Sequence, residues 1–382
     1  MKDSKSRLRV CHFTYSFSPT VGGMEEVIHK LSLALLSHDC EPYVFAPYVR
    51  GKDNRMAAPY KILRFSRPSS RRIGLRQLLI PLLWHHMRFR FDVLHCHGVY
   101  PAGYVGASFQ GITGTPFVIT PHGGDVREDD KGFIINKSVT ARIRRTLSSA
   151  GAVTAVSADM KSRVLSLGAR PDRVHVIPNG VSINEFELCE GRRHRAYDGQ
   201  PYILYLGRLI KTKGVDVLIR AFAEICKDHP TLSLKIAGDG AEMEALKELA
   251  RSLYMSEHIN FLGTVRGESK VCLLSGALFL ACPSREESFG IVNLEAMASG
   301  LPVVATKIGG ILDVIQDGEN GFLIESDDVG QLTEKMRLLL ESHELRQRMS
   351  LRALQSVSRF DWSHIIQDYL RVYRDVRNRD IT

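Results

Sequence analysis

The sequence has no apolar run of about 18 residues, the length that a membrane-spanning helix needs. Its basic first residues lead directly into a strand-like pattern, without the apolar core and small-residue cleavage site of a secretory signal. Its seven cysteines are scattered, and none stands in a Cys-x-x-Cys pair. A disulfide framework is therefore not expected, and we expect a cytoplasmic protein in a reducing compartment.

Acidic residues are missing from the whole interval between Asp53 and Asp92. Residues 1–190 hold 26 Lys and Arg against 16 Asp and Glu, while residues 191–382 hold 25 against 26, so the net charge of +9 arises in the first half. The window 55–90 mixes apolar residues with basic ones, namely Arg55, Lys61, Arg64, Arg67, Arg71, Arg72, Arg76, Arg88 and Arg90. This mixture suits contact with an anionic membrane surface, and it suits a solvated basic face beside a buried helix equally well. Nucleic acid is not expected as a partner, because no DNA- or RNA-binding motif accompanies the window.

A chain of 382 residues is too long for one ordinary hydrophobic core, so two domains are expected. Short apolar strands alternate with amphipathic helices, which is typical of a parallel α/β sheet. The polar segment 181–200 interrupts this pattern and reads as a linker, after which the pattern restarts. We expect one domain over residues 1–185 and a second over 186–359, with the last helix, at about 360–382, packing back on the first.

Two basic residues follow the first strand of the second half. In "YLGRLIKTKGVDVLIRA", Arg208 and Lys213 lie in the loop before a helix that Gly214 opens. Two cations beside a helix N-terminus suit a diphosphate, because arginine can bind two oxygens and the helix dipole adds positive potential. Two exposed surface cations are the alternative. The position at the carboxyl end of a strand favours the phosphate interpretation.

Two glutamates, Glu287 and Glu295, flank the segment "SFGIVNL". The preceding "LFLACPS" is predicted to be a buried strand, and a helix is predicted to begin near Ile291. Glu287 then lies in the exit loop of the strand, and Glu295 lies about one turn into the helix. Carboxylates there can accept hydrogen bonds from sugar hydroxyls, while the free loop amides face a phosphate or hydroxyl oxygen. The alternative is a helix-terminal charge and an exposed side chain.

Glycines and histidines mark strand ends in the first half. Gly22 and Gly23, in "PTVGGMEE", precede a helix and suit either an anion or a plain tight turn. His95 and His97 share one face of a predicted strand, but no further metal ligand is evident near them in the sequence, so no metal site is expected. The chain contains no Asp-x-Asp, which agrees with stabilisation of a leaving group without a metal ion.

Taken in order, these pieces resemble the retaining GT-B glycosyltransferases of family 4. The resemblance covers nearly the whole chain and rests on "GGMEE", "DVLHCHG", "TPHGGD", "VSADMKSRV", "VIPNGV", "LGRLIKTKGVDVLIRAF", "IAGDG", "FLGTV", "ESFGIVNLEAMASGLPVVAT" and "GGILDVIQDGENGFL". It implies the GT-B fold, in which two Rossmann-like α/β domains face each other across a cleft. The first domain would bind the acceptor and the second the nucleotide-sugar donor.

The resemblance also implies roles for single residues. Glu295 would bind the ribose hydroxyls and Glu287 the donor sugar. Arg208 and Lys213 would neutralise the diphosphate, and His122, in "TPHGGD", matches the active-site histidine of the family. The other residues expected at the donor are Gly22, Gly23, Gly238, Leu262, Val265, Ser288, Phe289, Gly290 and Ile291, and those expected at the acceptor are Asp125, Ser157, Lys161 and Asn179.

The expected reaction is transfer of a sugar from a nucleotide diphosphate to an acceptor hydroxyl with retention and without a metal or other cofactor. A UDP-sugar is preferred over GDP-mannose, by frequency among relatives. The acceptor is expected to be a lipid-linked saccharide or glycolipid of cell-surface polysaccharide synthesis, reached at the cytoplasmic face of the membrane. A GT-B nucleotide-sugar epimerase and a non-catalytic GT-B binding subunit are the alternatives.

Overall fold

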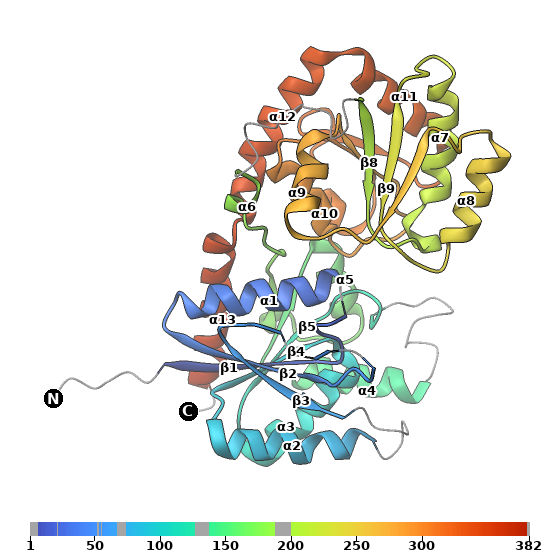
Figure 1. Ribbon diagram of the computed structural model, residues 1–382. Coiled ribbons are helices and arrows are strands. Elements are labelled where there is room, and N and C mark those ends of the chain that lie inside the picture. Colours follow the sequence, from blue (N-terminus) through green and yellow to red (C-terminus); the bar gives the residue numbers. More distant parts are fainter. Residues whose placement is uncertain are drawn as a thin grey trace. The chain divides into compact units, whose positions relative to one another are not determined.

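The computed structural model divides into two compact units, Met1–Gly180 with Trp362–Thr382, and Val181–Asp361 (Figure 1). It describes residues 7–20, 22–51, 53–54, 56–66, 74–126, 137–187 and 200–379. The division falls after Gly180, whereas the sequence placed it after residue 185. Val181 belongs to the second unit because its amide donates to Phe360 O at 2.9 Å and it forms an isolated bridge with Asp361.

A parallel sheet of seven strands, in the order β3-β2-β1-β4-β5-β6-β7, forms the first unit. The strands are β1 (Leu8–Thr14), β2 (Cys40–Pro47), β3 (Lys61–Phe65), β4 (Val93–His97), β5 (Phe117–Thr120), β6 (Ala152–Ala155) and β7 (Val174–Val176). The helices are α1 (Gly23–Leu36), α2 (Gly74–Phe89), α3 (Tyr104–Thr113), α4 (Lys137–Ser149), α5 (Ala158–Ser166) and α13 (Trp362–Arg379), with the short turns η1 (Val99–Gly103) and η3 (Pro171–Arg173).

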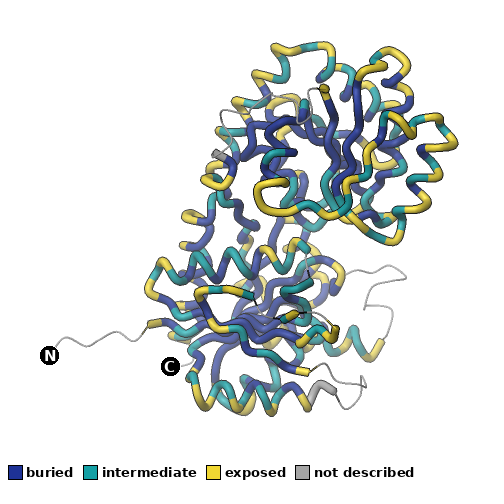
Figure 2. Tube along the Cα trace, in the orientation of Figure 1, coloured by how far each residue is buried: buried dark blue, intermediate teal, exposed yellow. Residues whose placement is uncertain are grey.

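The central strands of this sheet are buried along their whole length, as Figure 2 shows by their dark blue colour. Parallel strands need cover on both faces, which explains their continuous apolar runs. Helices α1 and α13 pack together on one face, and α2 and α3 pack together on the other (Figure 1). The last helix therefore returns to the first unit, where it buries Tyr369 and Tyr373 against β4 and β5.

The second unit holds a parallel sheet of six strands, in the order β10-β9-β8-β11-β12-β13. The strands are β8 (Tyr202–Leu206), β9 (Ser233–Ala237), β10 (Ile259–Gly263), β11 (Leu280–Cys282), β12 (Val303–Thr306) and β13 (Gly321–Ile324). The helices are α6 (Asn184–Glu187), α7 (Val215–Cys226), α8 (Met243–Ser252), α9 (Gly267–Gly276), α10 (Ile291–Ala298), α11 (Val329–Glu341) and α12 (His343–Val357), with the short turns η5 (Lys211–Lys213), η6 (Gly309–Asp313) and η7 (Ser358–Phe360).

Both sheets reverse their strand order beside their first strand, between β1 and β4 in one unit and between β8 and β11 in the other. Because all strands are parallel, their carboxyl ends share one edge of each sheet. Ligands of doubly wound sheets bind at this edge, next to the reversal. The expectation of two doubly wound α/β units is confirmed, and each unit offers one such edge.

Two elements differ from the sequence prediction. Strand β3 lies in the basic window and was not expected, because Lys61 and Arg64 interrupt its apolar residues and only Leu63 and Phe65 are buried. Helix α6 lies in the segment expected to be a linker, and residues 188–199 of that segment lie outside the described residues. Among the described helices, none combines the length and the apolar character needed to cross a membrane.

Candidate active site

The loop after β11 and the start of α10 form the centre of the candidate site in the second unit. Helix α10 begins at Ile291, as predicted, and Gly290 is its N-cap residue in a left-handed conformation. Within the described residues, the amides of Phe289, Gly290 and Ile291 donate no hydrogen bond to the chain. Free amides at a helix N-terminus, together with the helix dipole, favour an anion or a hydroxyl oxygen in front of them. The neighbouring Ser288 is partly exposed.

Glu287 and Lys213 meet at the point where the strand order reverses. The Lys213 ammonium donates a hydrogen bond to Glu287 Oε2, and the two side chains are 17% and 16% exposed. Lys213 ends the turn η5 after β8, and Glu287 lies in the loop after β11. The fold thus joins two residues that the sequence analysis singled out separately, and it places a cation and an anion at one partly open position.

Glu295 has a partner that the sequence analysis missed. Lys270 Nζ on α9 lies 2.6 Å from Glu295 Oε1, where the carboxylate side chain is only 9% exposed. The two residues are 25 positions apart, and Lys270 stands in no motif quoted above. The sequence contained no signal for this pair, because only the folded chain brings a side chain of α9 to one of α10.

Arg285 ties the two loops that carry Lys213 and Glu287. Its guanidinium donates two hydrogen bonds to Asp216, at 2.9 and 2.7 Å, one to Lys211 O at 2.6 Å and one to Asp327 at 2.7 Å. Partial burial alone would raise the pKa of Asp216, but the hydrogen bonds and charge of Arg285 outweigh it and lower that pKa. This charge-assisted network fixes the η5 turn against the β11–α10 loop.

Two glycines allow the backbone of this edge to pack closely. At Gly214, which has a φ of +64°, a Cβ atom would lie 1.9 Å from Pro283 O. At Gly238, a Cβ atom would lie 1.8 Å from Gly207 O. Any side chain there would collide with the backbone of a neighbouring loop. These contacts explain the glycines in "KTKGVD" and "IAGDG" without any reference to a ligand.

The remaining donor-side candidates lie at the same edge with less defined contacts. The backbone oxygen of Arg208 accepts a hydrogen bond from Tyr205 OH at 2.9 Å, and Arg208 is exposed. Leu262 is 38% exposed at the end of β10, and Val265 is partly exposed in the loop that follows. These exposures leave the three residues accessible to a ligand.

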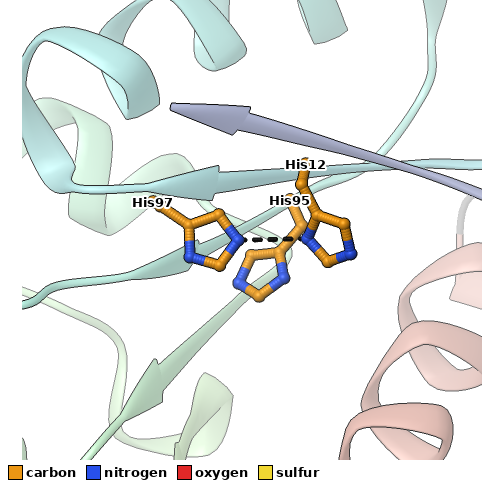
Figure 3. A group of neighbouring side chains, drawn as sticks. All are labelled: His12, His95 and His97. Carbon is orange, nitrogen blue, oxygen red and sulfur yellow. Dashed lines mark hydrogen bonds between the residues drawn. The ribbon is translucent and has the colours of Figure 1, made fainter. Parts of the chain in front are cut away.

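In the first unit, histidines gather at the carboxyl ends of β1, β4 and β5. His97 Nδ1 lies 3.1 Å from His122 Nε2. On the other side of the ring, His97 Nε2 lies 3.0 Å from His12 Nδ1, the contact drawn as a dashed line in Figure 3. Burial lowers the pKa of His122 to about 4 and that of His12 to about 3. The predicted active-site histidine therefore belongs to a row of neutral imidazoles.

The sequence analysis found no further metal ligand beside His95 and His97, and the fold corrects this. Strand β1 brings His12 next to them, because residues 12 and 95 are register partners in the sheet. One nitrogen of each of the three rings lies within 4.8 Å of the others, a spacing that a metal ion can use. In the structure, however, His95 shares hydrogen bonds with Tyr373 OH at 2.7 Å and Thr120 Oγ1 at 2.6 Å.

Asp125 organises the loop that carries His122. Its carboxylate accepts a hydrogen bond from the amide of Val99, and the amides of Asp125, His122 and Gly123 also point at it. Burial raises the pKa of Asp125, although these four amides act in the opposite direction. This expected acceptor-side residue thus binds backbone in the structure.

The other candidates of the first unit take different places. Gly22 is the N-cap of α1 and Gly23 its first residue, and a Cβ atom at Gly22 would lie 2.6 Å from a carboxylate oxygen of Glu25. The predicted anion position therefore faces a carboxylate. The other three are Ser157, which caps α5 through the amide of Met160 at 3.1 Å; Lys161, which is exposed on α5; and Asn179, whose buried Oδ1 has no partner among the described residues.

Comparisons with known proteins identify the family. The description "Glycosyltransferase Family 4" matches residues 21–185, and "Glycosyl transferases group 1" matches residues 190–356. The D-inositol 3-phosphate glycosyltransferase of Acidothermus cellulolyticus is 32% identical over 309 residues, which cover 75% of this chain and 67% of that protein. The chain therefore belongs to the family 4 glycosyltransferases and is a glycosyltransferase.

Solved structures show the same fold at lower identity. Sucrose-phosphate synthase from Thermosynechococcus elongatus superposes with a TM-score of 0.85 and 20% identity, covering 98% of this chain and 100% of that one. HepE of Anabaena, in a complex with UDP and glucose, superposes with a TM-score of 0.81 and 21% identity, covering 96% and 100%. The fold is GT-B, with two Rossmann-like units.

Proposed function

We propose that this glycosyltransferase moves a sugar from a nucleotide diphosphate donor to an acceptor hydroxyl, with retention of the anomeric configuration and without a metal ion. The observation that carries the proposal is the meeting of Lys213 and Glu287 in front of α10, at the strand-order reversal of the second unit. This position combines a cation for a phosphate, a carboxylate for sugar hydroxyls and free amides at a helix N-terminus.

In this proposal each group has a defined partner on the donor. Glu295 binds the ribose hydroxyls, and Glu287 binds hydroxyls of the transferred sugar. The backbone around Leu262 and Val265 contacts the base, and Gly238 lies beside the nucleotide, where its backbone packs against Gly207. Arg208 and Lys213 bind the diphosphate. A UDP-sugar is our preferred donor over GDP-mannose, supported by the UDP in the structurally similar HepE complex.

The chemistry follows from the charges. Breaking the bond between sugar and phosphate leaves positive charge on the sugar and negative charge on the diphosphate. Lys213, Arg208 and the dipole of α10 would stabilise this leaving group, as preorganised electrostatic groups do in many enzymes. The acceptor hydroxyl would attack from the same face, and a phosphate oxygen would accept its proton. Exclusion of water from the bound donor would limit hydrolysis.

For the acceptor we propose a lipid-linked saccharide or glycolipid of cell-surface polysaccharide synthesis, reached at the cytoplasmic membrane face. Support comes from α2, where Ile80, Trp84 and Met87 are 72%, 55% and 67% exposed at helical spacing beside the exposed Arg88. Such an apolar stripe with basic flanks suits an anionic bilayer surface. The basic window itself contributes fewer free cations than expected, because the Arg64 guanidinium donates to Pro47 O, Ser18 O and Asn54 O.

Several arginines of the basic window 55–90 cannot be assigned to this surface from the structure. Arg55, Arg67, Arg71 and Arg72 lie outside the described residues, as does the side chain of Arg76. Lys61 pairs with Glu41 at 3.6 Å.

A second acceptor class, a small anionic polyol, is favoured by the inositol 3-phosphate named for the relative from Acidothermus.

The proposal is tested by thermal-shift measurements with UDP-, GDP- and ADP-sugars, with and without EDTA. We expect one nucleotide to raise the melting temperature, unaffected by EDTA, and Glu295→Ala to abolish that shift. Product analysis with candidate acceptors then separates transfer from epimerisation, which releases an altered nucleotide sugar without any acceptor. Absence of a shift with every nucleotide would contradict the donor site, and binding without turnover would favour a non-catalytic subunit.

A further inference from the structure

A row of three imidazoles leads from the sheet of the first unit to His122. His12 Nδ1 lies 3.0 Å from His97 Nε2, and His97 Nδ1 lies 3.1 Å from His122 Nε2. Burial lowers the pKa of all three rings, and that of His97 lies well below its ordinary range. Each ring is therefore neutral near pH 7 and carries one proton, on one of its two nitrogens.

The far end of the row fixes the direction of the hydrogen bonds. His12 Nε2 is buried and has no hydrogen-bond partner in the described part of the chain. A buried N–H group without an acceptor is less favourable than a bare lone pair. The proton of His12 therefore lies on Nδ1 and is donated to His97 Nε2. His97 then carries its own proton on Nδ1, donates it to His122 Nε2, and leaves the His122 proton on Nδ1.

We propose that His97 is a positioning residue that holds His122 as its Nδ1–H tautomer, so that His122 acts as a hydrogen-bond donor to a substrate oxygen and not as a base through Nε2. The inference rests on the proposed function and on the resemblance of "TPHGGD", which makes His122 the active-site histidine. His122 Nε2 is occupied by His97, whereas His122 Nδ1 forms no hydrogen bond with the residues that the structure describes. Nδ1 is the ring nitrogen left for a ligand.

A metal ion held by His12, His95 and His97 is the competing explanation of the cluster. The hydrogen bonds argue against it, because both nitrogens of His95 are bonded to hydroxyl groups and His97 Nε2 is bonded to His12. Within the described residues, the three histidines are also joined by no carboxylate that would offset the charge of a buried divalent metal ion. The ring nitrogens that a metal ion would need instead form hydrogen bonds between neutral side chains.

The position of the protons can be measured directly in the full-length protein labelled with ¹⁵N at histidine. Long-range ¹H–¹⁵N correlation spectra distinguish the two neutral tautomers, and single variants assign each ring. We expect the Nδ1–H pattern at His12, His97 and His122. An Nε2–H pattern at His122 overturns the proposal, and so does a spectrum of these rings that changes on treatment with EDTA. No activity is needed, so this result is independent of the proposed function.

Variants at His97 test the positioning role. The Asn amide of His97→Asn can still donate to His122 Nε2, whereas His97→Leu cannot. We expect His97→Leu to shift His122 toward mixed tautomers and to lower kcat about tenfold, the effect of one hydrogen bond, with His97→Asn close to wild type. An unchanged Nδ1–H pattern in His97→Leu contradicts the proposal.

His95→Asn is the matched control, because His95 lies on the same strand, is equally buried and contacts Tyr373 and Thr120. It should leave the tautomer of His122 unchanged. If His97→Leu fails to fold, the wild-type and His97→Asn spectra still decide the question, since the Nδ1–H pattern is expected in both.

Discussion

Lys270 Nζ lies 2.6 Å from Glu295 Oε1, in a place where the carboxylate is 9% and the lysine 20% exposed. An ion pair this little exposed is screened less by water and salt than a surface pair, so it holds both side chains more firmly. The carboxylate that we propose for the ribose hydroxyls is therefore oriented by a residue of a different helix. If Glu295 binds the ribose as we propose, Lys270 should influence nucleotide binding without contacting the nucleotide itself.

Replacement of Lys270 by Met should weaken nucleotide binding. The carboxylate loses its cation and its fixed orientation, and we expect the Kd for UDP to rise about tenfold, which corresponds to about 1.4 kcal/mol. Isothermal titration calorimetry measures this change. Lys247→Met is the control, because the pair of Lys247 with Glu244 is exposed on α8. An unchanged Kd in Lys270→Met would contradict the positioning role.

Lys213 should be essential for turnover if it stabilises the diphosphate leaving group. Removing one preorganised charge from a transition state costs on the order of 10²–10³ in rate, so Lys213→Ala should lower kcat by about that factor. Lys211→Ala is a matched control, since Lys211 is an exposed lysine of the same short turn. Its kcat should stay within about twofold of wild type, because exposed charges contribute little. Equal effects of both variants would count against the assignment.

Gly214→Ala should destabilise the second unit. The new Cβ would lie 1.9 Å from Pro283 O, at a φ of +64° that disfavours any side chain, so we expect a loss of about 3 kcal/mol or more in the free energy of unfolding. Gly318→Ala is the control, because Gly318 has a φ of +75° but open space around it, and should cost only about 1–2 kcal/mol. Differential scanning calorimetry compares the two. Similar losses would mean that the contact with Pro283 is relieved easily.

The buried histidines predict that acid destabilises the first unit. The pKa of His12 falls from 6.5 to about 3, and that of His122 from 6.5 to about 4. At a pH between the ordinary pKa of 6.5 and the lowered values, these histidines are protonated in the unfolded chain but neutral in the folded unit. Their contribution to the free energy of unfolding is therefore full above about pH 6.5 and declines as the pH falls toward about 4. The slope is up to about 1.4 kcal/mol per pH unit for each histidine.

Tryptophan fluorescence isolates this effect, because both tryptophans, Trp84 and Trp362, belong to the first unit. Urea unfolding between pH 7.5 and pH 5, followed at these residues, measures the decline. His122→Asn should flatten the slope by about one proton, whereas replacement of the exposed His343 in the second unit should not change it. A pH-independent midpoint would contradict the burial of neutral imidazoles.

The apolar stripe of α2 should bind anionic vesicles. Trp84→Ser removes a large exposed side chain from it, and we expect the fraction of protein that floats with phosphatidylglycerol vesicles at low salt to fall, with an affinity loss of about tenfold. Ile112→Ser is the control, because Ile112 is 61% exposed on α3 of the same unit. If the wild-type protein fails to float at low salt, the membrane proposal is wrong.

The class of fold follows from the sequence alone, because short apolar strands and amphipathic helices recur in an order that is typical of parallel sheets. The sequence also located Glu287 and Lys213 at strand ends and Glu295 about one turn into the following helix, since motif spacing and element boundaries are local properties. It missed β3, where Lys61 and Arg64 break the apolar pattern of an edge strand. Local patterns cannot report which residues from different elements meet.

Contacts between side chains of different helices and strands depend on the tertiary structure. Lys270 of α9 reaches Glu295 of α10 through its side chain, across 25 positions of sequence. His12 reaches His97 through the register of β1 beside β4, across 85 positions. The burial that removes the charge of the histidines likewise depends on the whole first unit, including α13 from the far end of the chain. The candidate residues could be identified from the sequence, but their interaction partners and protonation states follow from long-range contacts that only the folded chain creates.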